Sequence, residues 1–262
     1  MGMAPPRQRS RTPLRSVTHR PATPAFIASM STLAPFPDAV PLRAGHVARE
    51  EFTVIENFLD AGDIAPLVAN ANACRSHINR NFVPGIKKGG SVSYHDIRRH
   101  APDIHALYHA PAFIDWLNTL TGETLLTCPE NDPHACALYY YTEEGDHIGW
   151  HYDTSFYRGK RFTVLLGLVQ QSRSELVARL YHRSGARPAE DVRVDSRPGS
   201  LVVFNGDRCW HKVTPCGAHE DRVILSMEYV TDRHMSWGHR VVSNVKDAVA
   251  YFGIRALFRT GR

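Results

Sequence analysis

The sequence contains no run of 18 apolar residues, which excludes the long hydrophobic helix that spans a membrane. It has no internal repeat, and its five cysteines show neither a paired Cys-x-x-Cys nor the spacing of a disulfide framework. An odd number of cysteines without such a pattern predicts reduced thiols in a cytoplasmic protein. At 262 residues, 43% of them hydrophobic, the chain is long enough for a single domain with a full core.

Acidic residues are absent from residues 1–37, which contain seven prolines and five arginines. Such a segment cannot bury enough apolar surface to fold, so we predict a disordered Arg/Pro-rich tail over residues 1–45 and one domain over 46–262. A transit peptide, or an upstream start with Met30 as the true first residue, are the alternatives to a tail without function. The remainder holds 26 basic and 26 acidic residues, and this neutral body argues against a nucleic-acid enzyme.

The triplet His151-Tyr152-Asp153 follows an aromatic-rich segment, 135–141, that reads as a strand, and a polar turn at 143–146. Two residues apart in extended chain, His151 and Asp153 share one face and can meet one metal ion. The triplet alone is a weak signal, because a second one, His219-Glu220-Asp221, lies in a turn and reads as solvated. The first triplet therefore predicts a metal site only together with a third ligand.

His211 is the preferred third ligand because of its surroundings. A turn at 197–200, a buried strand at 201–204 and a second turn at 205–207 precede it. The weaker candidates are His182, His219, His234 and His239. Two imidazoles and one carboxylate are the ligands of the facial triad that holds non-haem Fe(II) and leaves positions open. A zinc site made of Cys209, His211 and Cys216 is a disfavoured alternative, because it leaves His151 and Asp153 without a role.

A long strand is predicted at 222–230, directly after this histidine region. Its alternation places polar Arg222, Ser226 and Glu228 on one face with Ile224, and four apolar residues on the other: Val223, Leu225, Met227 and Tyr229. Three polar groups on an otherwise apolar strand predict a wet cavity on that side.

The pattern His151-x-Asp153, His211 sixty residues later and then Arg222 resembles the Fe(II)/2-oxoglutarate-dependent oxygenases. The resemblance covers about residues 125–232, including the turn and strand at 198–204, and more weakly the segment 52–59. It implies a mainly β fold with flanking helices, whose core is a double-stranded β-helix, the cupin-like jelly roll. By the resemblance, His151, Asp153 and His211 bind Fe(II) and Arg222 pairs with the distal carboxylate of 2-oxoglutarate. Tyr141, with Tyr139 as second choice, stands where several members place a tyrosine against that carboxylate.

The implied reaction uses O₂ and the co-substrate 2-oxoglutarate and hydroxylates an unactivated C–H bond. Asp153 favours hydroxylation or desaturation, since halogenating members carry Gly or Ala at that position. Ser226 and Glu228, with the acidic turn that contains Glu143, Glu144 and Asp146, favour a small polar substrate with an amine, such as a free amino acid or its derivative. The alternatives are a peptidyl hydroxylase, an oxidative demethylase of an alkylated base, or a non-catalytic cupin-like binding protein.

The N-terminal half of the domain is predicted to be helical. One helix is expected from Asp60 or Asp63 to about Cys74, and another from 103 to 120, stopped by Gly122. The segment 81–100, with its glycines and lysines, reads as a long loop that could act as a lid. A short closing helix is expected at 245–258.

Overall fold

The computed structural model describes residues 36–153, 157–185 and 187–234. Contacts divide the chain into the units 1–32 and 33–262, and every described residue belongs to the second. The elements of this unit are, in order, α2 Val40–Ala48, β1 Phe52–Ile55, α3 Ala61–Ala73, the 3-10 helix η1 Cys74–His77, β2 Asn79–Val83, β3 Lys87–Val92, α4 Tyr94–His100, α5 Pro102–His109, α6 Pro111–Thr121, β4 Leu126–Thr127, β5 Cys136–Tyr141, β6 His147–His151, β7 Arg161–Gln171, β8 Leu176–Leu180, β9 Glu190–Val194, β10 Leu201–Asn205, β11 Trp210–Val213 and β12 Asp221–Val230.

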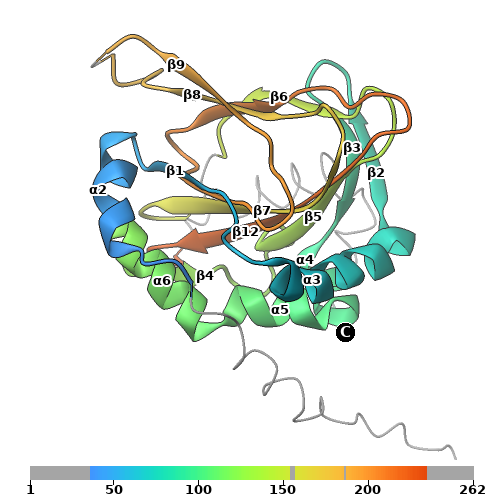
Figure 1. Ribbon diagram of the computed structural model, residues 1–262, viewed down its shortest axis with the longest axis horizontal. Helices are drawn as coiled ribbons and strands as arrows, with labels where there is room; N and C mark the ends of the chain where they lie inside the picture. The colour runs from blue at the N-terminus through green and yellow to red at the C-terminus, as the bar shows by residue number, and fades with distance from the viewer. Residues whose placement is uncertain (1–35, 154–156, 186, 235–262) are drawn as a thin grey trace, which may run out of the picture. The chain divides into compact units, whose positions relative to one another are not determined.

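The strands form one antiparallel sheet that curls back over itself. The order is β1-β10-β7-β12-β5-β3-β6-β11-β8-β9, with β2 added beside β3 and β4 beside β12. Figure 1 shows the half that contains β6, β8 and β9 lying over the half that contains β7, β12 and β5. The result is a nearly closed barrel with flanking helices, and the predicted jelly-roll fold is confirmed.

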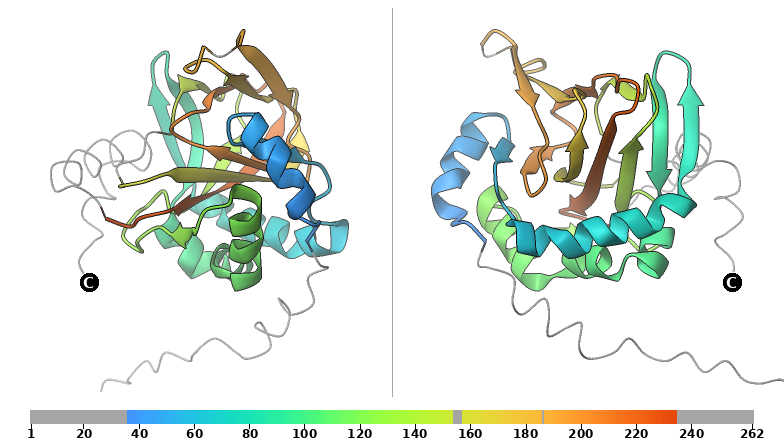
Figure 2. Two further views of the ribbon diagram at one scale, coloured as in Figure 1. Left: turned by 90° about the vertical axis from the view of Figure 1, so that its left-hand side faces the viewer. Right: turned by 45° about the vertical axis from the view of Figure 1, so that its right-hand side comes forward.

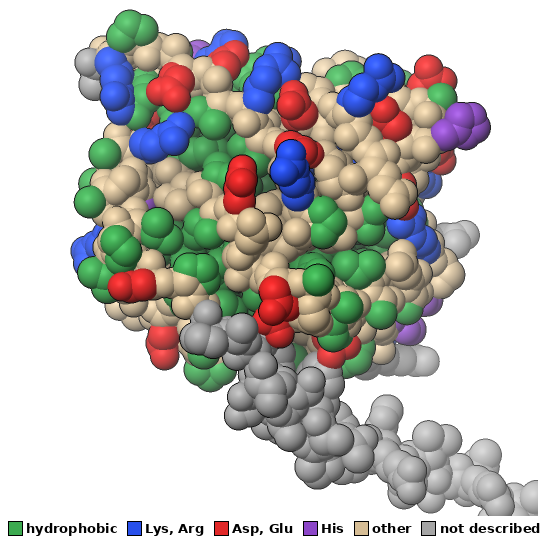
Figure 3. All heavy atoms as spheres, viewed as in Figure 1, with side chains coloured by type: hydrophobic (Ala, Val, Ile, Leu, Met, Phe, Trp, Pro, Cys, Tyr) green, Lys and Arg blue, Asp and Glu red, His purple; other side chains and the backbone are tan. Residues whose placement is uncertain are grey.

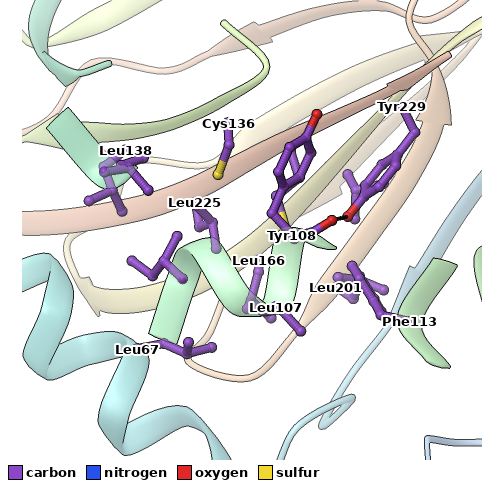
Figure 4. Close-up of a cluster of buried hydrophobic side chains, with 14 of the residues drawn as sticks. Leu67, Leu107, Tyr108, Phe113, Cys136, Leu138, Leu166, Leu201, Leu225 and Tyr229 are labelled. Carbon is purple, nitrogen blue, oxygen red and sulfur yellow. Dashed lines mark hydrogen bonds between the residues drawn. The ribbon is translucent and has the colours of Figure 1, made fainter. Parts of the chain in front are cut away.

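Helices α3, α5 and α6 cover the outer side of the β7–β12–β5 half, as the two views of Figure 2 also show. The main hydrophobic core lies in this layer, where Leu225 and Tyr229 of β12 join Leu107 and Phe113 of the helices. The Tyr229 hydroxyl donates a 2.9 Å hydrogen bond to the Tyr108 carbonyl (Figure 4). Burying each such side chain contributes about 1.5–3 kcal/mol, so this layer carries much of the stability.

Strand β12 has the two faces that its alternation predicts. Its four apolar residues belong to the main core, while Arg222, Ser226 and Glu228 are buried on the other side. A second, smaller hydrophobic cluster contains Phe204, Ile148 and Tyr141, on strands β10, β6 and β5. The barrel interior is therefore part apolar and part polar, and its polar side chains include Arg222, Ser226 and Glu228, which the sequence predicts to face a cavity.

Helix α3 confirms the predicted first helix: the Asp60 carboxylate accepts hydrogen bonds from the amides of Gly62 and Asp63, at 2.8 and 2.9 Å. The predicted single helix at 103–120 is instead two helices, α5 and α6. Pro111 separates them, since a proline inside a helix removes a hydrogen bond but is well placed at the start of the next one. Gly122 ends α6, as predicted.

The predicted loop at 81–100 is wrong, because these residues form most of β2, all of β3 and α4. Strand β3 pairs with both β5 and β6 and so joins the two halves of the sheet. The glycines of β3 make it look like a loop in the sequence. At Gly90, however, an added Cβ would lie 2.6 Å from Ile78 and 3.3 Å from the Tyr140 Cβ. Glycine is thus present there because side chains of the neighbouring segments leave no room for a Cβ, and it does not mark a flexible loop.

Residues just before the predicted domain start at residue 46 also contact the domain. Helix α2 begins at Val40, its His46 is fully buried, and the Phe36 ring stacks on Phe58 with centroids 5.0 Å apart. These contacts hold residues 36–45 against the domain, which a compositional boundary cannot reveal. The expected entry strand is confirmed as β1. The expected helix at 245–258 lies outside the described residues.

No helix in the described ranges is long and apolar enough to cross a membrane. All five cysteines are free and buried, as the absence of a disulfide framework predicts. On the face drawn in Figure 3, acidic and basic side chains are interspersed with apolar ones. This distribution fits the neutral body that the sequence predicts.

Candidate metal and co-substrate site

Three predicted ligands converge inside the barrel. His151 ends β6, Asp153 follows two residues later, and His211 lies on β11 directly opposite His151 in the strand register. Their ligand atoms all lie within 4.8 Å of one another, and this is the one group of three potential metal ligands among the described residues. His151 Nε2 is 3.4 Å from Asp153 Oδ1, and His211 Nε2 is 3.7 Å from Asp153 Oδ2. This spacing suits a single cation placed between them.

Backbone carbonyls orient both imidazoles toward the shared point. His151 Nδ1 lies 2.8 Å from the Gly149 carbonyl, and His211 Nδ1 lies 3.0 Å from the Cys209 carbonyl. A carbonyl can only accept, so Nδ1 carries the hydrogen in each ring and the neutral Nε2 offers its lone pair. Burial lowers the pKa of His211 to about 4, which keeps that imidazole in the neutral, ligating form.

Asp153 supplies the negative charge of the group. Burial alone would raise its pKa, but His211 and His151 outweigh burial and hold the pKa of Asp153 well below its usual range. The contact with Asp153 also changes the pKa of His151. Burial lowers this pKa, but the hydrogen bond and the charge of Asp153 outweigh burial, so the pKa of His151 is raised. Asp153 is therefore ionised and ready to bind a metal.

The site is open on one side. The side chains of His151 and Asp153 are 23% and 20% exposed, whereas that of His211 is 6% exposed. The backbone at Gly206 makes room for the group, because a Cβ there would lie 2.9 Å from the Asp153 Cβ. Any larger residue at Gly206 would push Asp153 out of place.

Arg222 lies at the start of β12 and is 1% exposed. Its Nη2 donates to the Ser196 hydroxyl at 3.2 Å, while Nε and Nη1 find no hydrogen-bond partner within the described part of the chain. Burial lowers its pKa, although a guanidinium still keeps its proton at neutral pH. A buried guanidinium with unpaired N–H groups costs stability unless an anion completes it, and a carboxylate matches its fork of donors.

Tyr141 lies opposite Arg222 in the register of β5 and β12, with the guanidinium 5.0 Å from its ring centre. Burial raises the pKa of Tyr141 to about 12, so its hydroxyl stays protonated and can donate to an anion. Tyr139, the second choice, lies 4.9 Å from the Nζ of Lys87 instead. The structure thus associates Tyr141 with Arg222 and Tyr139 with a different cation.

Lys87 is an interior residue that the sequence did not reveal. It lies on β3, is 2% exposed, and burial lowers its pKa to about 7. Its charge acts on His151, whose pKa it lowers slightly. Only Val92 is apolar on β3, so no alternation could identify Lys87 as an inward-facing strand residue.

Ser226 and Glu228 both face the interior, as predicted. The Ser226 hydroxyl is 3.2 Å from Glu228 Oε1, and Arg161 Nε donates to Glu228 Oε2 at 2.9 Å. Burial raises the pKa of Glu228 to about 7, opposed by the charge of Arg161. Oε1 has Ser226 as its hydrogen-bond partner and retains lone pairs for a further donor.

In the acidic turn at 143–146, the Asp146 carboxylate is occupied by partners within the protein, which corrects its expected part in a ring of carboxylates for substrate. Asp146 is fully buried, pairs with Arg80 at 2.6 Å, and accepts hydrogen bonds from the amides of Thr142 and Glu143. Glu143 also pairs with Arg80, at 2.9 Å. Asp146 stabilises the turn, and the turn sequence could not show this because its partner lies 66 residues away.

The alternative ligands are not brought together. His182, His219 and His234 are exposed, and His239 lies outside the described residues. The Cys216 thiol donates to the Tyr141 carbonyl at 3.3 Å, and Cys209 joins the second hydrophobic cluster. Within the described ranges, therefore, no zinc site forms from Cys209, His211 and Cys216.

Comparisons with known proteins agree with this geometry. A family model described as Halogenase D matches residues 57–158, a segment that includes His151 and Asp153 but ends before His211. A search of curated proteins finds no match. Among solved structures, the non-heme alpha ketoglutarate dependent epimerase SnoN from nogalamycin biosynthesis is 18% identical, with a TM-score of 0.60 over 73% of this chain and 82% of that one.

Two further structures extend the likeness. A prolyl hydroxylase from Trichoplax adhaerens, in complex with a peptide fragment, is 19% identical, with a TM-score of 0.59 over 78% of this chain and 92% of its own. A 2OG-Fe(II) oxygenase family protein from Burkholderia pseudomallei is 15% identical, with a TM-score of 0.54 over 74% of this chain and 91% of its own. The chain has the fold of the Fe(II)/2-oxoglutarate-dependent oxygenases.

Proposed function

We propose that this protein is an Fe(II)/2-oxoglutarate-dependent dioxygenase that hydroxylates an unactivated C–H bond. The observation that carries the proposal is the convergence of His151, Asp153 and His211 in the same barrel as Arg222, whose buried Nε and Nη1 await an anion. A non-catalytic binding protein would have no need to retain both a complete triad and this arginine.

Different residues would bind the metal ion and the co-substrate. Nε2 of His151 and of His211 and the Asp153 carboxylate would hold Fe(II), which together with 2-oxoglutarate and O₂ supplies the oxidising chemistry. Arg222 would pair with the distal carboxylate of 2-oxoglutarate through two parallel hydrogen bonds. Tyr141 would add a third donor to the same carboxylate, since its hydroxyl remains protonated.

Asp153 supports hydroxylation in place of halogenation. Although the matching family model bears the name of a halogenase, halogenating members of the oxygenase family that this sequence resembles carry Gly or Ala where this chain has Asp153. A carboxylate at this position takes the coordination site that a chloride ion would need. This argues against a halogenated product and leaves desaturation as the alternative to the hydroxylation that we propose.

The substrate class that we propose is a small polar molecule with an amine, such as a free amino acid or its derivative. Support comes from the interior face of β12, where Ser226 and Glu228 are buried and Oε1 of Glu228 can accept a further hydrogen bond. An ammonium group there would also offset the cost of burying the Glu228 carboxylate. Asp146 of the acidic turn gives no support to this substrate class, because its carboxylate is paired with Arg80.

A succinate-release assay tests the activity. We expect succinate from 2-oxoglutarate that requires added Fe(II) and O₂ and that rises with the right substrate. Arg173→Leu is a matched control for any arginine variant, since this side chain is 91% exposed. Failure to release succinate under every condition, in protein that binds Fe(II), would favour the binding-protein alternative.

A substrate screen tests the class. Free amino acids, short peptides and methylated oligonucleotides are compared by the succinate that each stimulates, using the full chain. Stimulation by an amine-bearing small molecule, weakened in Glu228→Gln, is the expected result. Stimulation by peptides or oligonucleotides alone would overturn the proposed substrate class and leave the proposed reaction standing.

A further inference from the structure

Thr163 contacts the candidate metal ligand Asp153 but is not itself one of the three ligands. It is on β7, where it pairs with Phe204 of β10 on one side and with Glu228 of β12 on the other. Its side chain is 2% exposed. Thr163 Oγ1 is 2.8 Å from Asp153 Oδ2 and 3.0 Å from Glu228 Oε2, so one hydroxyl touches two carboxylates.

A threonine hydroxyl has a single hydrogen to donate, so the two carboxylates compete for it. Glu228 already receives the Arg161 Nε hydrogen, at 2.9 Å, and has Ser226 as a further partner. Asp153 Oδ2 has Thr163 as its one side-chain hydroxyl partner among the described residues, and His211 Nε2 lies farther away at 3.7 Å. Glu228 has these other donors, so we assign the Thr163 hydrogen to the shorter contact, with Asp153.

The consequence concerns how many oxygens Asp153 presents to a metal. A carboxylate can bind through one oxygen or through both. Three protein ligand atoms leave three positions of an octahedron open, which 2-oxoglutarate, binding through two atoms, and O₂ would fill. A second oxygen from Asp153 would occupy one of the three. The stiff, β-branched Thr163 holds Oδ2 by its hydroxyl and leaves Oδ1, which is 3.4 Å from His151 Nε2, to face the metal.

We propose that Thr163 is a positioning residue that holds Asp153 as a one-oxygen ligand, and so keeps the third coordination position open for the co-substrate. This proposal rests on the proposed function. Hydrogen-bond partners beyond the ligands orient metal sites in general, and Arg161 donates to Glu228 Oε2, so that the Thr163 hydrogen can point to Asp153. Oε1 of Glu228 stays available to a substrate.

Three variants test the proposal. Thr163→Val keeps the shape and removes the hydroxyl, Thr163→Ser keeps the hydroxyl, and Thr119→Val is a control at an exposed position on α6. Without O₂, each protein is saturated with Fe(II) and titrated with 2-oxoglutarate, and the charge-transfer absorption of the Fe(II)–2-oxoglutarate complex is followed. Thermal unfolding checks that each variant is folded.

At saturating Fe(II), the Kd for 2-oxoglutarate should rise by about 10–100-fold in Thr163→Val, return close to wild type in Thr163→Ser and stay unchanged in Thr119→Val. An unchanged Kd in folded Thr163→Val would overturn the positioning role. Should Thr163→Val not fold, a crystal structure of the Fe(II)-loaded wild type decides: one Asp153 oxygen on the metal supports the proposal, and two contradict it. If the wild type binds no Fe(II), the proposed function fails instead.

Discussion

The two faces of strand β12 differ in how completely the protein's own atoms satisfy them. On the outer face, Leu225 packs against the helices and the Tyr229 hydroxyl donates to the Tyr108 carbonyl. On the inner face, Arg222 is as deeply buried, yet its Nε and Nη1 have no partner within the described residues. Folding alone supplies the packing and hydrogen-bond partners of the outer face. On the inner face, we expect a bound ligand to supply the partners that Arg222 lacks. This difference separates the part of the molecule that supplies stability from the part that supplies function.

The largest expected effect comes from removing a metal ligand. His211→Ala should lose most bound Fe(II) and all succinate formation, because two ligands alone hold Fe(II) weakly. Thermal unfolding should change little in the metal-free protein. Iron content and turnover are measured against His182→Ala, whose imidazole is exposed. Iron retained in His211→Ala and lost in His182→Ala would show that the ligand assignment is wrong.

Arg222→Leu should separate binding from stability on the inner face. The KM for 2-oxoglutarate should rise by about 100-fold or more, since two charge-assisted hydrogen bonds are lost. The Tm of the ligand-free variant should match or exceed that of wild type, because an unsatisfied buried charge is removed. Steady-state kinetics and thermal unfolding provide the two readouts. A lowered Tm with an unchanged KM would assign Arg222 to the structure and not to the co-substrate.

Leu225→Ala makes the opposite change on the outer face. It should lower the free energy of unfolding by about 2–5 kcal/mol, the usual cost of such a cavity. The KM for 2-oxoglutarate should stay within a factor of about two below the unfolding temperature. Denaturant unfolding and kinetics on the same preparation check this. A large change in KM would mean that the two faces are coupled.

The smallest effect is a pH dependence on the inner face. Burial raises the pKa of Glu228 from 4.5 in the unfolded chain to about 7 in the folded one. The folded state then binds this proton more tightly, so the contribution of Glu228 to stability is greatest below pH 4.5 and falls as the pH rises toward 7. The contribution is at most about 3 kcal/mol, and Glu228→Gln should remove it. Unfolding curves at several pH values, compared between the two proteins without metal, check the sign.

The sequence was sufficient for the parts of the site that depend on rare residue types at strand spacing. His151 and Asp153 share a face because β-structure repeats every two residues, and the same period sorted the two faces of β12. Lys87 was missed because β3 is made of lysines, glycines and a serine, with no apolar alternation to mark a strand. Glycines that make room for the side chains of neighbouring strands look, in sequence, like glycines of a loop.

Contacts between distant segments account for the remaining errors. Asp146 was expected at the mouth of the site, but Arg80 of β2 holds it inside the turn. Thr163 carried no signal, since a single hydroxyl within the apolar strand β7 becomes informative only when Asp153 and Glu228 are seen beside it. Local sequence patterns predict which face of a strand a side chain is on, but only the fold shows which distant residues it contacts.

The most direct test of the account is calorimetric titration of 2-oxoglutarate into the Fe(II)-loaded protein without O₂. We predict one molecule bound per chain, no binding when Fe(II) is withheld, and loss of at least about 2 kcal/mol of binding free energy in Arg222→Leu. Equal binding by wild type and Arg222→Leu, or no binding by the Fe(II)-loaded wild type, would contradict the claim that metal and co-substrate complete the inner face.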